Sequence, residues 1–151
     1  MSSRESSEQR DHGSERMPAS NGRPVILLAE DNEDTRSVYG LILRHYGCEV
    51  HEASEGHDAL DRARQLAPDI ILMDIGLPGL DGYQVSRLLK TDPSTRDILI
   101  IAFSANVDSA SDLAGRTSFD GFILKPVSPT DLVRRIQSYC ELLSVTQRRT
   151  G

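Results

Sequence analysis

The stretch 69–82 constrains the fold of this 151-residue chain more than any other, and it reads DIILMDIGLPGLDG. Its four consecutive apolar residues, 70–73, are too few for a helix of their own and show no polar alternation. Such a run is typical of a strand that is buried on both faces of a parallel sheet. Asp74 follows at once, at the edge where open α/β sheets bind ligands, and a loop with glycine and proline comes next. Taken alone, Asp74 is a candidate functional residue or an acid that caps a turn.

Four further segments have the character of strands, and helical patterns separate them. These expected strands are 25–29, 48–53, 98–103 and 119–124. Apolar spacings of three and four predict helices in segments 34–46, 54–67, 83–90 and 128–143, and a fifth helix is expected at 106–118, where the pattern weakens. Strands that alternate with helices in this way predict an α/β fold, a doubly wound five-stranded parallel sheet with helices on both faces. Right-handed crossovers then favour the strand order 2-1-3-4-5.

Individual helices carry more specific expectations. Val38, Leu41 and Ile42 form the expected inward stripe of the first helix, and Arg36 lies away from that stripe. Ser54 is the expected cap of the second helix. The segment 106–118 holds several poor helix formers, so a helix there is expected to be short or frayed.

Composition limits the class of protein. Residues 1–23 hold four Arg against four acids and almost no apolar side chains, which predicts a disordered tail; 24–143 is expected to be one domain, and 144–151 a fraying end. Beyond the first 23 residues the chain carries 13 Lys and Arg against 19 Asp and Glu, which disfavours nucleic acid as a partner. The chain has no apolar run of membrane-spanning length, no signal-peptide pattern, and two cysteines without metal-ligand spacing. We therefore expect a cytoplasmic protein that does not act at a membrane.

Acidic residues follow two of the expected strands. In the 2-1-3-4-5 order, a crevice opens between the first and third strands, whose ends carry Glu30, Asp31 and Asp74. Three converging carboxylates would repel one another unless a cation neutralised them. Oxygen ligands without His or Cys favour a hard ion, and a partial cage that leaves room for water and phosphate favours Mg²⁺. Acids at two strand ends also arise by chance, so this constellation alone leaves both interpretations open.

The other two strand ends favour the functional interpretation. Ser104 and Lys125 follow the fourth and fifth strands and lie at the same edge of the sheet as the carboxylates. Each has an ordinary explanation in isolation: Ser104 is a turn residue, and Lys125 is a solvated charge before a proline. Together, a carboxylate nucleophile, a hard metal, a hydroxyl and an ammonium are the groups needed to accept a phosphoryl group.

On these motifs the chain resembles the receiver domains of two-component response regulators over 24–143. The matching segments are ILLAEDN at 26–32, IILMDIGLPGLDG at 70–82, FSA at 103–105 and GFILKP at 121–126. The resemblance implies a flavodoxin-like three-layer sandwich. It also implies a signalling switch that is no enzyme beyond catalysing its own Mg²⁺-dependent phosphorylation and dephosphorylation.

The resemblance assigns roles to individual residues. Asp74 would be the phosphoacceptor. Mg²⁺ would be held by Asp31, Asp74 and the carbonyl of Gly76, with Glu30 helping through water. Ser104, Ala105 and Lys125 would bind the phosphoryl oxygens. Ser104 and Phe122 would move on phosphorylation, and the Lys125-Pro126 bond would be cis. Two departures from the family pattern affect the fourth helix: the segment before Phe122 is about one residue short, and Ser118 stands where a glycine commonly precedes the last strand.

Two main hypotheses follow. The first is a stand-alone receiver, monomeric or weakly dimeric when phosphorylated, that is phosphorylated by a histidine kinase or phosphotransfer protein and acts on a downstream protein target. The second is an interaction module that keeps the fold but works without phosphorylation. A phosphohydrolase ranks third, because Gly76 occupies the place where such enzymes carry a second Asp. A flavin-binding protein is disfavoured, because Glu30 and Asp31 would repel its phosphate.

Overall fold

The computed structural model describes residues 22–105 and 118–150, and its centre is a sheet of five parallel strands. The strands are β1 Val25–Ala29, β2 Glu49–Ala53, β3 Ile70–Met73, β4 Leu99–Ser104 and β5 Gly121–Leu124. Their order is β2-β1-β3-β4-β5, as the sequence predicts. The predicted α/β class and strand order are therefore confirmed.

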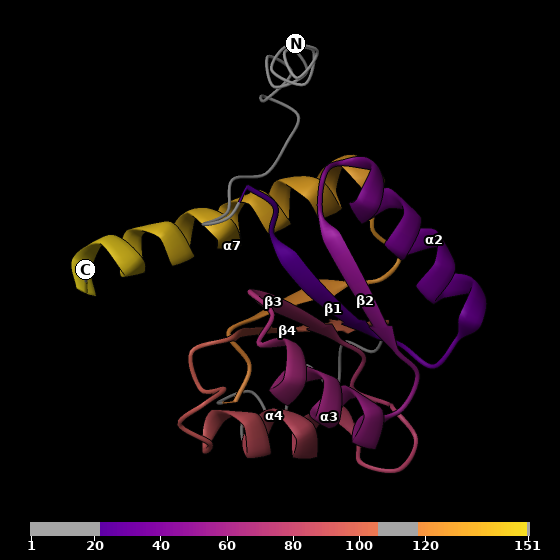
Figure 1. Ribbon diagram of the computed structural model, residues 1–151. Coiled ribbons are helices and arrows are strands. Elements are labelled where there is room, and N and C mark those ends of the chain that lie inside the picture. Colours follow the sequence, from indigo (N-terminus) through magenta and orange to yellow (C-terminus); the bar gives the residue numbers. More distant parts are fainter. Residues whose placement is uncertain (1–21, 106–117, 151) are drawn as a thin grey trace, which may run out of the picture.

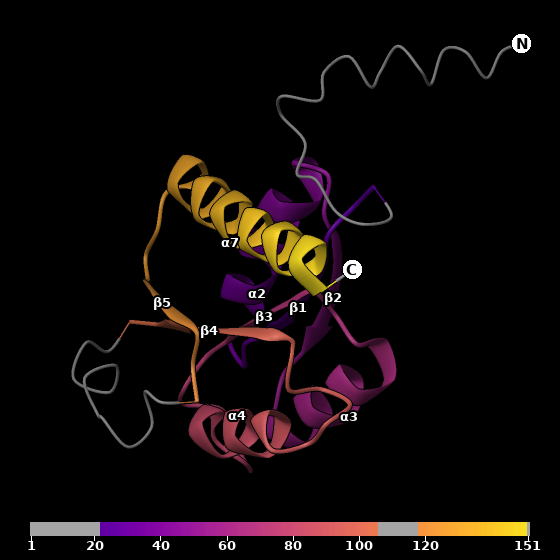
Figure 2. The ribbon, with the colours of Figure 1, turned by 90° about the vertical axis from the view of Figure 1, so that its left-hand side faces the viewer.

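Helices cover both faces of this sheet (Figures 1 and 2). They are α2 Glu33–His45, α3 Gly56–Leu66, α4 Gly82–Lys90 and α7 Pro129–Thr150. In both views α2 and α7 lie on one side of the sheet, and α3 and α4 lie on the other. The result is the expected three-layer sandwich.

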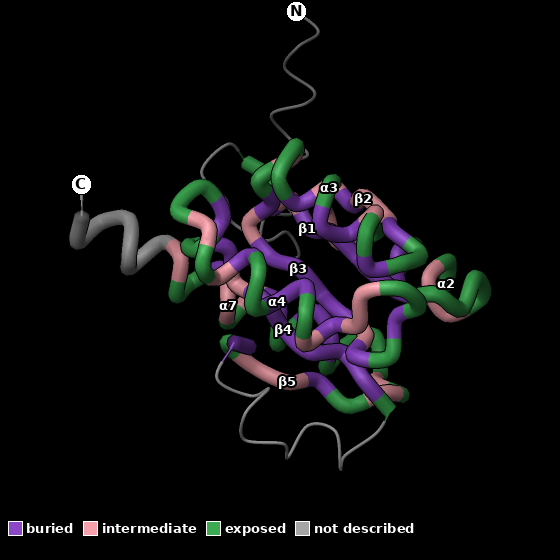
Figure 3. Tube along the Cα trace, turned by 90° about the horizontal axis from the view of Figure 1, so that it is seen from below, coloured by how far each residue is buried: buried purple, intermediate pink, exposed green. Residues whose placement is uncertain are grey.

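The core has two halves because successive strand residues point to opposite faces. In β1, Ile26 and Leu28 join the cluster under α2 and α7, whereas Leu27 and Ala29 join the cluster under α3 and α4. All four are fully buried, and Figure 3 shows buried residues running along the central strands. Strands buried on both faces explain the uninterrupted apolar runs.

The inward face of α2 differs from the prediction. Val38 and Leu41 are 54% and 69% exposed, whereas Tyr39, Gly40 and Leu43 are buried. Tyr39 contacts the Phe103 ring edge-on with 4.9 Å between ring centroids. Apolar residues occupy most of 38–43, so their spacing fits two neighbouring stripes, and packing of the Tyr39 ring decides between them.

Two helix ends also differ from expectation. The N-cap of α3 is Glu55, which makes no side-chain cap bond, so the prediction that Ser54 caps this helix is wrong. Instead, the Gly56 N–H donates to the Pro78 carbonyl at 3.2 Å, which ties the start of α3 to the loop after β3. At the other end of the chain, α7 continues past Leu143, where fraying was expected, to Thr150. The predictions for 106–117 and for most of the tail 1–23 lie outside the described residues.

Candidate metal and phosphoryl site

The register of β1 and β3 brings the predicted acids to one place. Ala29 pairs with Met73, so the residues that follow, Glu30 and Asp74, leave the sheet side by side. The Asp74 N–H donates to the Ala29 carbonyl at 2.9 Å, and the Glu30 N–H donates to the Ala53 carbonyl at 2.9 Å. Parallel pairing thus fixes the backbone on which the acids stand.

The carboxylates of Glu30, Asp31 and Asp74 converge as predicted. One carboxylate oxygen from each residue lies within 4.8 Å of the others. Gly76 lies beside them, because its N–H donates to Asp74 Oδ1 at 3.1 Å. An all-oxygen donor set suits a hard divalent cation, and this partial cage fits Mg²⁺, which keeps several waters. The residues present therefore fit the metal that the sequence predicts.

Lys125 reaches into the same crevice from the end of β5. Its Nζ contacts the carboxylate of Glu30 and lies 3.5 Å from Asp74 Oδ2. Its side chain is 13% exposed, and Nζ lies 5.3 Å from the centre of the Phe103 ring. An ammonium held in such a dry environment interacts strongly with negative charge.

Glu30 is 2% exposed, and this burial raises its pKa above the ordinary value. Hydrogen bonds from Lys125 and from the Asn32 N–H, the latter at 3.0 Å, oppose the rise, whereas the charge of Asp74 adds to it. Burial outweighs the compensating bonds because it disfavours the charged form directly. Burial of Glu30 therefore makes its charged form less favourable than that of an exposed glutamate, although Lys125 offsets part of this cost.

The remaining predicted residues surround this centre. Ser104 is the buried last residue of β4, and its carbonyl accepts from the Lys125 N–H at 2.9 Å. Ala105 is exposed and, with Lys125, lines a hollow of about 270 Å³. Phe122 on β5 is half-buried, and its ring centroid lies 5.7 Å from that of Phe119. The Lys125-Pro126 bond is cis, as the resemblance implies.

Arg36 is the site residue that the sequence analysis missed. It lies partly buried at 18% side-chain exposure, and its NH1 donates to the Glu30 carbonyl at 2.8 Å. The prediction placed Arg36 off the inward stripe of the first helix, and that placement gave no indication of this contact. Arg36, Gly40 and Arg44 are four residues apart and therefore lie on one face of α2. This spacing is the sequence signal that could have indicated a shared role for the two arginines.

The comparisons with known proteins agree with this geometry. The family model of the response regulator receiver domain matches residues 26–137. The chain belongs to the response regulator receiver family, and the resemblance drawn from its motifs is confirmed.

Two curated relatives illustrate the range of regulators that the chain is similar to. "DNA-binding response regulator MtrA" of Mycolicibacterium paratuberculosis is 31% identical over 77% of this chain and 51% of that protein. "Phosphate regulon transcriptional regulatory protein PhoB" of Klebsiella pneumoniae is 34% identical over 79% of this chain and 52% of that protein. The chain thus spans about half the length of these relatives.

Solved structures cover the chain in the same way. The receiver domain of sensor histidine kinase PA1611 from Pseudomonas aeruginosa is 31% identical, with a TM-score of 0.74 over 79% of this chain and 98% of that one. That structure has a magnesium ion coordinated in its active-site cleft. A response regulator structure from Chloroflexus aurantiacus is 28% identical with a TM-score of 0.73, over 79% of this chain and 98% of that one. Among the described residues, no helix is long and apolar enough to cross a membrane.

Proposed function

We propose that this receiver domain is a phosphorylation-dependent switch that accepts a phosphoryl group on Asp74. The observation that carries the proposal is the convergence of three carboxylates with Lys125, whose Nζ lies 3.5 Å from Asp74 Oδ2. This arrangement supports both parts of phosphoryl transfer: a carboxylate nucleophile, and positive charge where the phosphoryl oxygens would develop charge. The donor of the phosphoryl group would be a phosphohistidine.

The bond changes balance without a further reactant. A carboxylate oxygen of Asp74 forms a bond to phosphorus, the phosphorus–nitrogen bond of the donor breaks, and the histidine nitrogen keeps the electron pair and takes up a proton. Glu30, Asp31, Asp74 and the Gly76 carbonyl would hold Mg²⁺, which supplies charge neutralisation when it is bound. Lys125, Ser104 and the Ala105 backbone would bind the phosphoryl oxygens. Hydrolysis of this acyl phosphate, in which water forms a bond to phosphorus and the Asp74 carboxylate leaves, would release inorganic phosphate and return the switch to its first state.

The response would be a shift between two conformations. Ser104 would move toward the phosphoryl group, and Phe122 would turn inward from its place beside Phe119. A shift from about 1:99 to 99:1 needs roughly 5.5 kcal/mol of differential interaction. Loss of the Lys125 contact to Glu30 in favour of the phosphoryl oxygens would contribute to that difference.

The partners follow from the same proposal. A histidine kinase or phosphotransfer protein would dock on α2, where Val38 and Leu41 expose apolar side chains just after the acidic loop. Output would pass through contacts with a downstream protein target, from a cytoplasmic domain at 24–143 that is monomeric or weakly dimeric when phosphorylated. The relatives named as DNA-binding or transcriptional regulators place such a domain in longer proteins.

Intact mass after incubation with acetyl phosphate tests the proposal. We expect one added phosphoryl group in the presence of Mg²⁺, none without it, and none in Asp74→Asn. Asp97→Asn is the matched control, because Asp97 is an exposed aspartate in the turn before β4 and should leave the adduct unchanged. A folded chain that gains no mass under any of these conditions would instead support the phosphorylation-independent module.

A further inference from the structure

We propose that Arg36 and Glu52 act together as a positioning pair that holds the acidic loop in the geometry needed for the metal. Arg36 links two elements: its NH1 donates to the Glu30 carbonyl at 2.8 Å, and its Nε donates to Glu52 Oε1 at 3.2 Å. Glu52 stands on β2, and its side chain is 31% exposed. The loop that carries two of the proposed metal ligands is thereby tied through Arg36 to the neighbouring strand. This inference rests on the proposed Mg²⁺ site.

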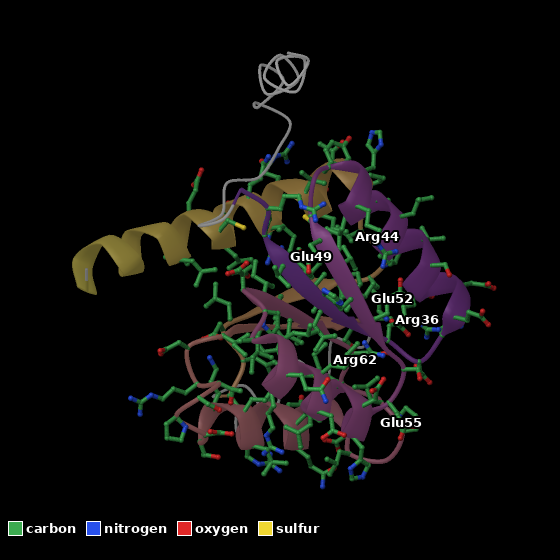
Figure 4. All side chains as sticks on the ribbon, in the orientation of Figure 1. Arg36, Arg44, Glu49, Glu52, Glu55 and Arg62 are labelled. Carbon is green, nitrogen blue, oxygen red and sulfur yellow. The ribbon has the colours of Figure 1, made fainter. Side chains whose placement is uncertain are left out.

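Glu52 is itself held in place from the other side. Its second oxygen, Oε2, lies 3.1 Å from Arg44 NH1, and Arg44 NH2 donates to the Val50 carbonyl at 2.9 Å. Figure 4 shows Arg36, Glu52 and Arg44 together along the strip between α2 and β2. Gly40 lies midway between the two arginines on α2, and a Cβ there would stand 3.1 Å from Glu52 Oε2. The absence of a side chain at Gly40 leaves room for the Glu52 carboxylate against the surface of α2.

Arg36 matters for the site because the path of the backbone at Glu30 and Asp31 directs their carboxylates. Main-chain bonds fix Glu30 on both sides: its N–H donates to Ala53 and its carbonyl accepts from Arg36. Asp31 comes next, is exposed, and depends on the path of the loop for the direction of its carboxylate. Groups that orient metal ligands typically change metal affinity 10- to 100-fold when they are removed. Arg36 has this orienting position without being a ligand.

Simple charge effects predict the opposite sign, which makes the proposal testable. If long-range electrostatics decided the outcome, removing Arg36 would raise the affinity for Mg²⁺, because the repulsion between the arginine and the metal ion would be lost. Positioning predicts that the affinity falls, because the carbonyl and the loop lose their tether. Arg36→Lys separates the two further, since it keeps the charge but lacks the rigid fork that reaches both partners.

The experiment is a Mg²⁺ titration of the full chain, in which the NMR amide chemical shifts of the loop residues report binding. We expect the Mg²⁺ dissociation constant to rise about 10-fold in Arg36→Met and in Glu52→Gln, and several-fold in Arg36→Lys. Arg62→Met is the matched control: it removes the same charge from an ion pair with Asp58 on α3, on the other side of the sheet, so its dissociation constant should stay within about twofold.

Two results would overturn the inference. One is a folded Arg36→Met that binds Mg²⁺ as tightly as the unaltered chain or more tightly; if that variant fails to fold, an Arg36→Lys affinity equal to that of the unaltered chain has the same meaning. The other is an Arg62→Met variant that is weakened as much as Arg36→Met, which would assign the effect to general stability. Failure of the proposed function would look different, because the unaltered chain itself would then show no Mg²⁺-dependent shifts.

Discussion

Substituting Gly56 with alanine tests how firmly the loop after Asp74 is seated on α3. An alanine Cβ at position 56 would stand 1.8 Å from the Leu80 carbonyl oxygen and 2.6 Å from its carbon. Ordinary contact begins at about 3.4 Å, so the Leu80 backbone would have to retreat by about 1.6 Å. That loop has little freedom to move, because Gly56 binds Pro78 at one point and the Gly82 N–H donates to Ile75 at 2.9 Å at another.

The cost can be estimated from these contacts. Overpacking against fixed backbone costs about 1–3 kcal/mol, and the Gly56 to Pro78 hydrogen bond adds about 1 kcal/mol if it is lost. The better helix propensity of alanine returns up to about 1 kcal/mol. We expect Gly56→Ala to lower the free energy of unfolding by about 2 kcal/mol, which corresponds to roughly 4–8 °C in Tm.

Urea unfolding followed by circular dichroism measures this difference, and Gly76→Ala is the matched control. A Cβ at Gly76 meets only Asp74 Oδ1, at 4.0 Å, so this change should stay within about 0.5 kcal/mol of the unaltered chain. The loop that has to move in Gly56→Ala also carries Gly76, so Gly56→Ala should bind Mg²⁺ more weakly as well. Equal stability of Gly56→Ala and the unaltered chain would refute the view that α3 fixes the loop.

Three further outcomes are expected. Leu41→Asp should slow phosphoryl transfer from a phosphorylated phosphotransfer domain at least several-fold yet leave labelling by acetyl phosphate unchanged, because Leu41 is 69% exposed on α2 and outside the site; equal slowing with both donors would argue against docking there. Burial raises the pKa of Cys48 and of Cys140 to about 12, so iodoacetamide at pH 8 should label neither thiol in the native chain and both in urea. Burial also raises the pKa of Glu30 above its ordinary 4.5, so the unfolded chain loses this proton first as the pH rises. The stability that Glu30 contributes is complete below pH 4.5 and is lost as the pH rises through its folded pKa. Urea titrations between pH 4 and 7 should therefore show a decline in the unaltered chain that is smaller in Glu30→Gln, and parallel curves would contradict the assignment.

Much of the architecture could be predicted because it depends on local pattern. Runs such as 70–73 have no polar alternation, and a parallel sheet buried on both faces is the structure that needs none. Once the strand order is fixed, chain direction alone brings Glu30, Asp74 and Lys125 to one edge of the sheet. The convergence of the site therefore required no knowledge of side-chain packing.

Contacts between distant segments could not be predicted in this way. Arg36 and Glu52 are 16 residues apart in the chain, and neither carries a local signal that names the other. The predicted stripe of α2 includes Val38 and Leu41, whereas the buried face includes Tyr39 and Leu43, because all four residues are apolar and close together in the helix. Shape decides such cases: the Tyr39 ring packs edge-on against Phe103, and a Cβ at position 40 would stand 3.1 Å from Glu52 Oε2.

Ser118 stands where the family pattern commonly has a glycine, and it makes a contact with a distant residue, Ser86. Its hydroxyl lies buried 2.6 Å from Ser86 Oγ, and Ser86 uses its own proton to donate to the Tyr83 carbonyl at 2.9 Å. The two hydroxyls share a hydrogen bond, which fixes the chain to α4 just before Phe119 and β5. Because Tyr83 contacts Phe119 and Phe119 contacts Phe122, the aromatic residue that we propose to move rests on the same helix. A serine at this position thus secures the packing against which a turn of Phe122 would have to occur.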